Sequence, residues 1–134
     1  MSASSRPKKK NGRILVVDDE PTVARATARA ISRDYDVVIE NDPARAKDRL
    51  LSSEGFDLVL CDLTMPVLSG QELYAAIMRE RPELASKFVF VTGGTFTPAA
   101  RVFLASVKNP CLMKPFSIES LREIVRGIIP SAKI

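Results

Sequence analysis

Residues 56–62 read FDLVLCD, a nearly continuous apolar run that ends in an acid, Asp62. Gly55, directly before it, interrupts the helical pattern that comes earlier in the chain. A strand with one face in water alternates apolar and polar side chains, and this run does not. The pattern therefore predicts a strand covered on both faces, as in a parallel sheet with helices on each side.

Four more short apolar runs lie on either side of this stretch. They are Arg13 to Val17, Tyr35 to Glu40, Phe88 to Val91 and Cys111 to Met113. A helical pattern follows every run and opens on residues that favour a helix start, namely Pro21, Asp42 with Pro43, Ser69 with Glu72, Thr97 with Pro98, and Ser117. Five strands alternating with five helices predict a three-layer α/β domain built on a parallel sheet.

The 134 residues suffice for one folded domain, which we place at 13–130. Residues 1–12 are rich in Ser, Lys and Pro and predict a flexible basic leader, and 131–134 form a short C-terminal tail. Five of the 20 basic residues lie within the first 13 positions, so the rest of the chain holds 15 basic and 16 acidic residues. The net charge of +4 therefore belongs to the leader, and we expect no specific nucleic-acid binding.

Other function classes are excluded by what the composition lacks. The chain has no histidine, which removes Ser-His-Asp and Cys-His catalysis, and its two cysteines cannot form a Cys-rich zinc site. Its apolar runs are far shorter than the ~20 residues of a membrane-spanning helix, and no secretory signal begins the chain. We expect a cytoplasmic protein without a membrane partner.

Residues able to do chemistry stand at the ends of four predicted strands. They are Asp18, Asp19 and Glu20 after the first strand, Asp62 after the third, Thr92 after the fourth and Lys114 after the fifth. Parallel strands bring these positions to one edge of the sheet, where ligands bind in such folds. Crowded carboxylates repel one another unless a cation offsets them, and Mg²⁺ prefers oxygen ligands.

This set of groups suits phosphoryl transfer to a carboxylate. An ionised Asp is already a nucleophile and needs no general base, while Lys114 can approach an anion and Thr92 offers a hydroxyl. Each residue taken singly is more often a turn or capping residue. The phosphoryl-transfer interpretation rests on all of these residues occurring together, at the ends of four strands.

In four segments the sequence resembles the response-regulator receiver domain, over about residues 13–129. The segments are ILVVDDEP, LVLCDLTMPVLSG, FVFVTGG and CLMKPF, in that order. The resemblance implies a flavodoxin-like (βα)5 domain with strand order 2-1-3-4-5. It further implies that Asp62 accepts the phosphoryl group, that Thr92 and Lys114 contact that group, and that Mg²⁺ is the cofactor. The implied metal ligands are Asp18, Asp19, Asp62 and the backbone carbonyl of Thr64.

The same resemblance implies partners and an output. A histidine kinase or phosphotransfer protein would supply the phosphoryl group, and the domain would act as a signalling switch with at most slow autodephosphorylation. A downstream partner or a second copy of the chain would bind the face formed by the fourth helix, the fifth strand and the fifth helix. The segments TGGTFTP and CLMKPF also resemble receivers of hybrid histidine kinases, so the chain is either a stand-alone regulator or a module of such a kinase.

Three departures from the family pattern affect the expected output. Cys111 stands where the family has its switch aromatic, and we expect it to be a small apolar filler rather than a redox sensor. Gly94 and Thr64 occupy positions that commonly tune the phosphoryl lifetime, which therefore stays open. Ser69 replaces a frequent Asp but retains its capping role.

Two rival functions remain open. One is a binding module that keeps the fold and signals without phosphorylation, which the replacement at Cys111 suggests. The other is a phosphohydrolase with an aspartyl-phosphate intermediate, but such enzymes usually have an Asp as acid/base where this chain has Thr64.

Overall fold

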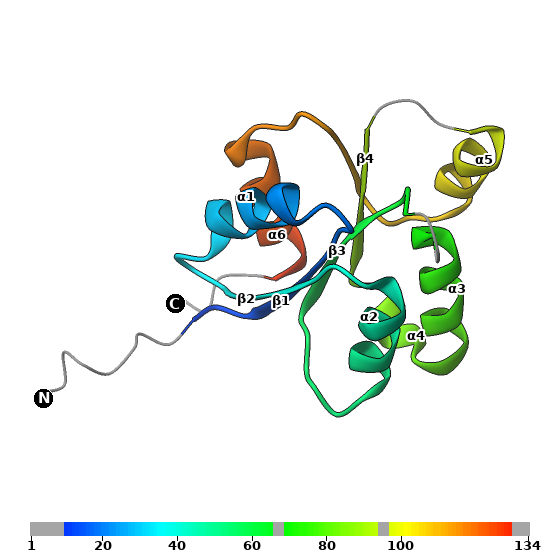
Figure 1. Cartoon of the computed structure of the whole chain (residues 1–134), viewed down its shortest axis with the longest axis horizontal. Coiled ribbons are helices and arrows are strands. Elements are labelled where there is room, and N and C mark those ends of the chain that lie inside the picture. The colour runs from blue at the N-terminus through cyan, green and yellow to red at the C-terminus, as the bar shows by residue number, and fades with distance from the viewer. Residues whose placement is uncertain (1–9, 66–68, 94–96, 130–134) are drawn as a thin grey trace, which may run out of the picture.

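A central parallel sheet with helices on both faces organises the molecule (Figure 1). The computed structural model describes residues 10–65, 69–93 and 97–129, and the structural statements below concern these residues. Most of the expected leader and all of the expected C-terminal tail lie outside them, as does Gly94.

All neighbouring strands of the sheet run parallel. The strands are β1 (Arg13–Val17), β2 (Asp36–Glu40), β3 (Leu58–Asp62), β4 (Phe88–Thr92) and β5 (Cys111–Met113). Their order is β2-β1-β3-β4-β5. The predicted parallel sheet and its order are thus confirmed.

Six helices are present in the described part of the chain, one more than expected. They are α1 (Pro21–Ile31), α2 (Pro43–Leu51), α3 (Gly70–Glu80), α4 (Pro82–Ala85), α5 (Pro98–Ser106) and α6 (Ile118–Ile128). The unpredicted α4 is a single turn, too short to show a helical period, with Pro82 at its first position and Leu84 and Ala85 buried. The expected fourth and fifth helices are therefore α5 and α6.

Four predicted capping residues do close the first turn of their helices. Ser69 accepts a hydrogen bond from the Glu72 N–H at 3.1 Å, and the Glu72 carboxylate accepts one from the Ser69 N–H at 2.9 Å. This is the predicted capping box. The side chains of Asp42, Thr97 and Ser117 also accept hydrogen bonds from backbone N–H groups. These caps fix where the strand-end loops become helices.

Alternate strand residues enter two separate hydrophobic cores. Leu15 and Val17 pack on the side of α2, α3 and α4, whereas Ile14 and Val16 pack on the side of α1 and α6 (Figure 1). Every residue of β3 is buried, which agrees with the doubly covered strand predicted from FDLVLCD. Burial on both faces holds the central strands, and hence their ends, in place.

The edge strand β5 corrects one expectation. Strand side chains alternate between faces, and Leu112 takes the buried position, leaving Cys111 and Met113 exposed. Cys111 is thus not a core filler. Desolvation by the surrounding atoms nevertheless raises the pKa of the Cys111 thiol, so its reactive thiolate is disfavoured at neutral pH.

The strand register brings the ends of β1, β3, β4 and β5 to one edge of the sheet. Val17 pairs with Cys61, so Asp18 and Asp62 follow side by side. On the other side of β3, Asp62 pairs with Val91, next to Thr92. Within the described residues, no helix has the length and apolar character needed to cross a membrane.

Candidate functional site

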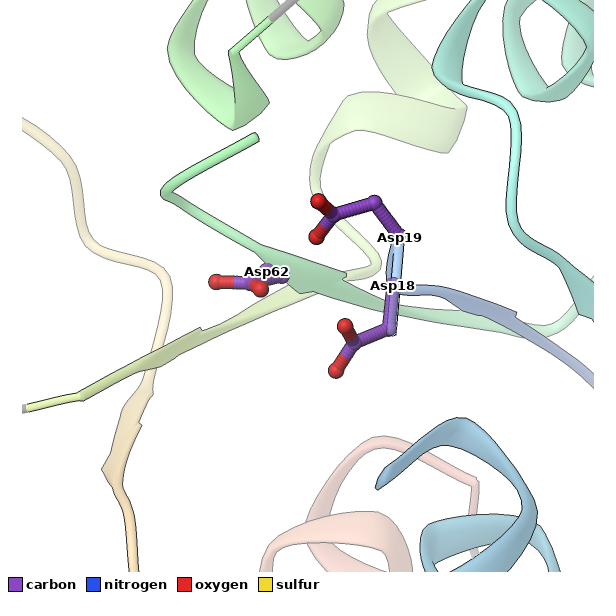
Figure 2. Close-up of side chains that lie close together, drawn as sticks. All are labelled: Asp18, Asp19 and Asp62. Atoms are coloured by element: carbon purple, nitrogen blue, oxygen red, sulfur yellow. The ribbon is translucent and has the colours of Figure 1, made fainter. Parts of the chain in front are cut away.

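Three carboxylates converge at the shared edge of β1 and β3. Figure 2 shows Asp18 and Asp19 at the end of β1 beside Asp62 at the end of β3. One carboxylate oxygen from each lies within 4.8 Å of those of the other two. Asp18 and Asp62 are buried and Asp19 is half-buried. The prediction that these three acids lie close together is confirmed.

Asp18 has both carboxylate oxygens occupied. Its Oδ1 accepts a hydrogen bond from the Glu20 N–H at 3.0 Å, which closes the turn between β1 and α1. Its Oδ2 accepts one from the Lys114 ammonium at 3.3 Å. The charge-assisted bond ties the end of β1 to the segment after β5.

Both carboxylate oxygens of Asp62 also have a partner, but the contact of one of them with Lys114 is longer than a hydrogen bond. Its Oδ1 accepts a hydrogen bond from the Thr64 N–H at 3.1 Å, and its Oδ2 lies 3.6 Å from the Lys114 Nζ. Burial raises the pKa of Asp62 to about 6, although the Thr64 N–H and Lys114 oppose the rise. The charges of Asp18 and Asp19 push the pKa further upward.

Lys114 is the cation facing these acids. Burial by itself lowers the pKa of its ammonium, but the carboxylates of Asp62 and Asp18 outweigh that effect and raise it. Its backbone N–H donates to the Thr92 carbonyl oxygen at 2.7 Å, which anchors the residue to the end of β4. Lys114 is therefore charged and held over the acid cluster.

A pocket of about 480 Å³ opens over this cluster. Its walls include the expected residues Asp19, Asp62 and Lys114, and Thr64, whose carbonyl we expected as a ligand. Three further lining residues were not in the predicted site, namely Glu20, Met65 and Gly93. Glu20 is one of the acids expected at the end of the first strand, without a role in the site, and Gly93 directly follows Thr92, so strand-end position points to both.

Thr92 lies at the edge of an adjacent pocket. Its side chain is buried, and together with Thr64 and Thr97 it lines a hollow of about 300 Å³. Thr64 and Met65 line both pockets, so the two hollows are direct neighbours. The structure thus places Thr92 next to the acid pocket rather than among the residues that line it.

Gly70 allows the backbone that carries Asp62 to approach α3. Its N–H donates to the Leu63 carbonyl oxygen at 3.1 Å. A Cβ atom at this position would lie 2.5 Å from the Asp62 carbonyl oxygen, closer than atoms can come without a shift. Because Gly70 has no side chain, α3 can begin in close contact with the backbone at the end of β3.

The donor set fits a divalent cation with hard-ligand preference. Three carboxylates face one ammonium, which leaves a formal excess of two negative charges when all are ionised. Mg²⁺ is typically held by one or two carboxylates with waters and phosphate oxygens completing its shell, and the open pocket has room for these. The absence of Cys and His ligands in this cluster disfavours zinc.

A family model described as a response regulator receiver domain matches residues 14–126 of the chain. The chain is also 36% identical over 118 residues to the sensor histidine kinase TmoS of Ectopseudomonas mendocina, and 30% identical over 117 residues to the response regulator ArlR of Staphylococcus haemolyticus. Each match covers 87% of this chain, but only 12% of the kinase and 52% of the regulator. The chain therefore spans no more than about half of these relatives.

Among solved structures, the receiver domain of a sensor histidine kinase from Pseudomonas aeruginosa PAO1 is similar, with a TM-score of 0.73 and 26% identity. The similarity covers 90% of this chain and 98% of that one. That structure has a magnesium ion coordinated in its active-site cleft.

Proposed function

The chain belongs to the response regulator receiver domain family, and we propose that it takes a phosphoryl group onto Asp62 from a histidine kinase or a phosphotransfer protein. As a receiver domain of two-component signal transduction it is a signalling phospho-acceptor and not an enzyme in the ordinary sense.

One observation carries the proposal: a buried carboxylate, Asp62, lies in an open pocket between two further carboxylates and an ammonium. Burial and the acids disfavour its negative charge, so a cation that offsets this charge is bound favourably. A structural ion pair would not need a third carboxylate, Asp19, at the same place.

The proposed step is an in-line displacement at phosphorus. An oxygen of the ionised Asp62 carboxylate forms the new O–P bond while the N–P bond of the donor phosphohistidine breaks. The electron pair of that bond stays on the imidazole nitrogen of the donor. No base is required in the pocket because the nucleophile is already deprotonated above its pKa of about 6. Lys114 offsets negative charge on the transferred oxygens.

We propose that Asp18, Asp19 and Asp62, with the backbone carbonyl of Thr64, hold a Mg²⁺ ion here. When bound, the ion supplies charge neutralisation and orients phosphate oxygens. Receiver domains bind Mg²⁺ in their acidic pocket, and a similar receiver has the ion in its cleft. The clustered carboxylates and the place of Thr64 in the wall of the same pocket support this arrangement in this chain.

The proposed output begins at Lys114 and Thr92 and reaches the face formed by α5, β5 and α6. Receiver domains act on downstream partners, and this face presents apolar side chains to solvent. Val102 on α5 is 71% exposed and Met113 on β5 is 53% exposed. We propose that a downstream protein or a second copy of the chain covers it in the phosphorylated state.

Autodephosphorylation would be slow, because Thr64 offers no acid or base where a hydrolase needs one. The relatives include both a sensor kinase and a response regulator, so the chain fits either context. A cytoplasmic location follows if its donor is the cytoplasmic part of such a kinase.

The proposal is tested by intact mass after incubation with Mg²⁺ and acetyl phosphate. The wild type is expected to gain one PO₃ group, and Asp62→Ala to gain none. Asp48→Ala is the matched control, since Asp48 is an exposed acid on α2. An adduct of equal yield on Asp62→Ala, or no adduct on the wild type, contradicts the proposal.

A further inference from the structure

The hydrogen-bond ladder between β1 and β2 ends next to the acid cluster. Its last backbone bond runs from the Asp18 N–H to the Glu40 carbonyl oxygen at 3.3 Å. In a parallel pair every second residue of one strand bonds to two residues of the other that lie two positions apart, one through its N–H and one through its carbonyl oxygen. The next bond of the ladder would therefore run from the Asp42 N–H to the Asp18 carbonyl oxygen.

That bond is replaced. The Asp42 N–H donates instead to the side chain of Glu40, at 3.1 Å from Oε2. Asp42 then caps α2, so the chain turns away from the sheet at this point. Without another donor, the Asp18 carbonyl would lose its partner at the edge of the acid pocket.

Asn41 supplies the missing donor. Its side-chain Nδ2 lies 2.8 Å from the Asp18 carbonyl oxygen, a short hydrogen bond across the ends of the two strands. A side-chain amide thus takes the place of a backbone N–H and extends the ladder by one position. It acts on the residue whose carboxylate contacts both Lys114 and the Glu20 N–H.

The turn that presents Asn41 is itself anchored. Glu40 is buried, and its Oε1 accepts a hydrogen bond from the Arg49 Nε at 3.1 Å. Arg49 also bonds to Glu54 at 3.0 Å, and Glu54 is paired with Arg13 at 3.2 Å. These ion pairs connect the end of β2 to α2 and to the start of β1. They hold the backbone next to Asn41 in place.

We infer that Asn41 is a positioning residue for the metal site: its amide holds the Asp18 backbone so that the carboxylates of Asp18 and Asp19 stay beside Asp62. Mutual repulsion of the three carboxylates pushes the β1–α1 turn outward, and the bond from Asn41 opposes that movement. Groups that orient ligands in this way typically matter to metal affinity about tenfold or more. The inference rests on the proposed Mg²⁺ site.

The test is Mg²⁺ affinity, measured by following backbone amide signals of Asp19 and Glu20 by NMR during titration with MgCl₂. Asn41→Ala is expected to bind Mg²⁺ about tenfold more weakly than the wild type. It should still fold, since Asn41 is exposed. Asn109→Ala is the control: Asn109 also donates to backbone carbonyls, those of Ala85 and Phe88, but at the opposite end of β4. It should lower thermal stability and leave the Mg²⁺ affinity unchanged.

Asn41→Asp separates position from charge. The variant keeps the shape of the side chain but presents an acceptor to the Asp18 carbonyl, so positioning predicts weaker Mg²⁺ binding. An added negative charge acting only through space would strengthen binding instead. Wild-type affinity in Asn41→Ala, or tighter binding in Asn41→Asp, overturns the inference and leaves the proposed function standing. A wild type that binds no Mg²⁺ overturns both.

Discussion

At the scale of single residues, the carboxylate of Asp62 is held in an environment that disfavours its charge. It is buried at the end of β3, with the carboxylates of Asp18 and Asp19 nearby and the ammonium of Lys114 opposite. Sites of this kind commonly lower the stability of the fold in exchange for function. The cost is greatest in the metal-free protein, and this gives it a measurable signature.

Asp62→Asn is expected to stabilise the metal-free protein by roughly 1 kcal/mol above pH 7. The pKa of Asp62 rises from 3.8 to about 6 on folding, so the native state holds the proton more tightly than the unfolded chain. Ionisation of Asp62 therefore lowers the free energy of unfolding of the wild type, with its full effect above pH 6. The stability difference between Asp62→Asn and the wild type should shrink as the pH falls from 6 to 4. Urea unfolding at several pH values measures it. A stability gain of Asp62→Asn that is unchanged at pH 3.5 would contradict the raised pKa of Asp62.

Lys114→Met is expected to destabilise the metal-free protein by about 1 to 2 kcal/mol, because Asp18 and Asp62 lose their cation. The same change removes a positive charge that repels a divalent ion. Added Mg²⁺ should therefore raise the melting temperature of the variant more than that of the wild type. Calorimetry with and without Mg²⁺ measures both effects, and a smaller Mg²⁺ response in the variant would show that Lys114 helps to build the metal site.

The acids and Lys114 could be predicted from sequence because strand direction alone sends Asp18, Asp62 and Lys114 to one edge of a parallel sheet. The contact of Asn41 with the Asp18 carbonyl could not. It depends on a ladder that ends one position early, and a side-chain bond to a backbone carbonyl leaves no periodic pattern in the sequence. The burial of Glu40 could not be predicted either. Charged side chains are rarely buried without a partner, and the sequence does not show that Arg49 pairs with Glu40.

At the scale of elements, the start of α3 decides how the loop after β3 carries Asp62. Gly70→Ala is expected to destabilise the protein by about 2 kcal/mol, because the new methyl group would meet the Asp62 carbonyl oxygen at 2.5 Å. Gly127→Ala is the matched control in α6, where an added Cβ meets nothing within 4 Å. It should stabilise the protein by roughly 0.5 to 1 kcal/mol through the higher helix propensity of Ala. Urea unfolding of both variants compares them, and equal effects would contradict the packing at Gly70.

The helix α5 is held to the sheet by fewer buried residues than its neighbours. Within α5 Ala100 is buried and Phe103 and Leu104 are partly so, whereas five residues of α3 are buried. Amides of residues 98–106 are therefore expected to exchange with solvent faster than those of residues 70–80. Hydrogen-exchange mass spectrometry under native conditions measures the two segments in one experiment. Equal protection would show that α5 does not loosen independently.

Helix starts were predictable and the single-turn α4 was not. Asp42, Ser69, Thr97 and Ser117 act through bonds to residues two or three positions ahead, so the local sequence is enough to place them. The turn of α4 is stabilised by burial of its own Leu84 and Ala85 in the core that also holds Phe88. Such burial depends on the assembled sheet.

At the scale of the whole molecule, the fold separates the site from the surfaces around it. Two cores on opposite faces of the sheet support the strand ends, and helices α1 and α6 cover one face while α2, α3 and α4 cover the other (Figure 1). The site lies where β1, β3, β4 and β5 end, at one edge of the sheet. The segments similar to this chain make up 12% of the sensor histidine kinase TmoS and 52% of the response regulator ArlR.

The most direct measurement locates the phosphoryl group after incubation with acetyl phosphate. Borohydride reduces an acyl phosphate to an alcohol and leaves free carboxylates intact, so a labelled Asp becomes homoserine. The tryptic peptide spanning residues 50–79 contains both Asp57 and Asp62, which provides an internal control. We predict homoserine at Asp62, dependent on Mg²⁺, and intact Asp57. Label at any other acid, or at Asp62 with equal yield in EDTA, would contradict the account.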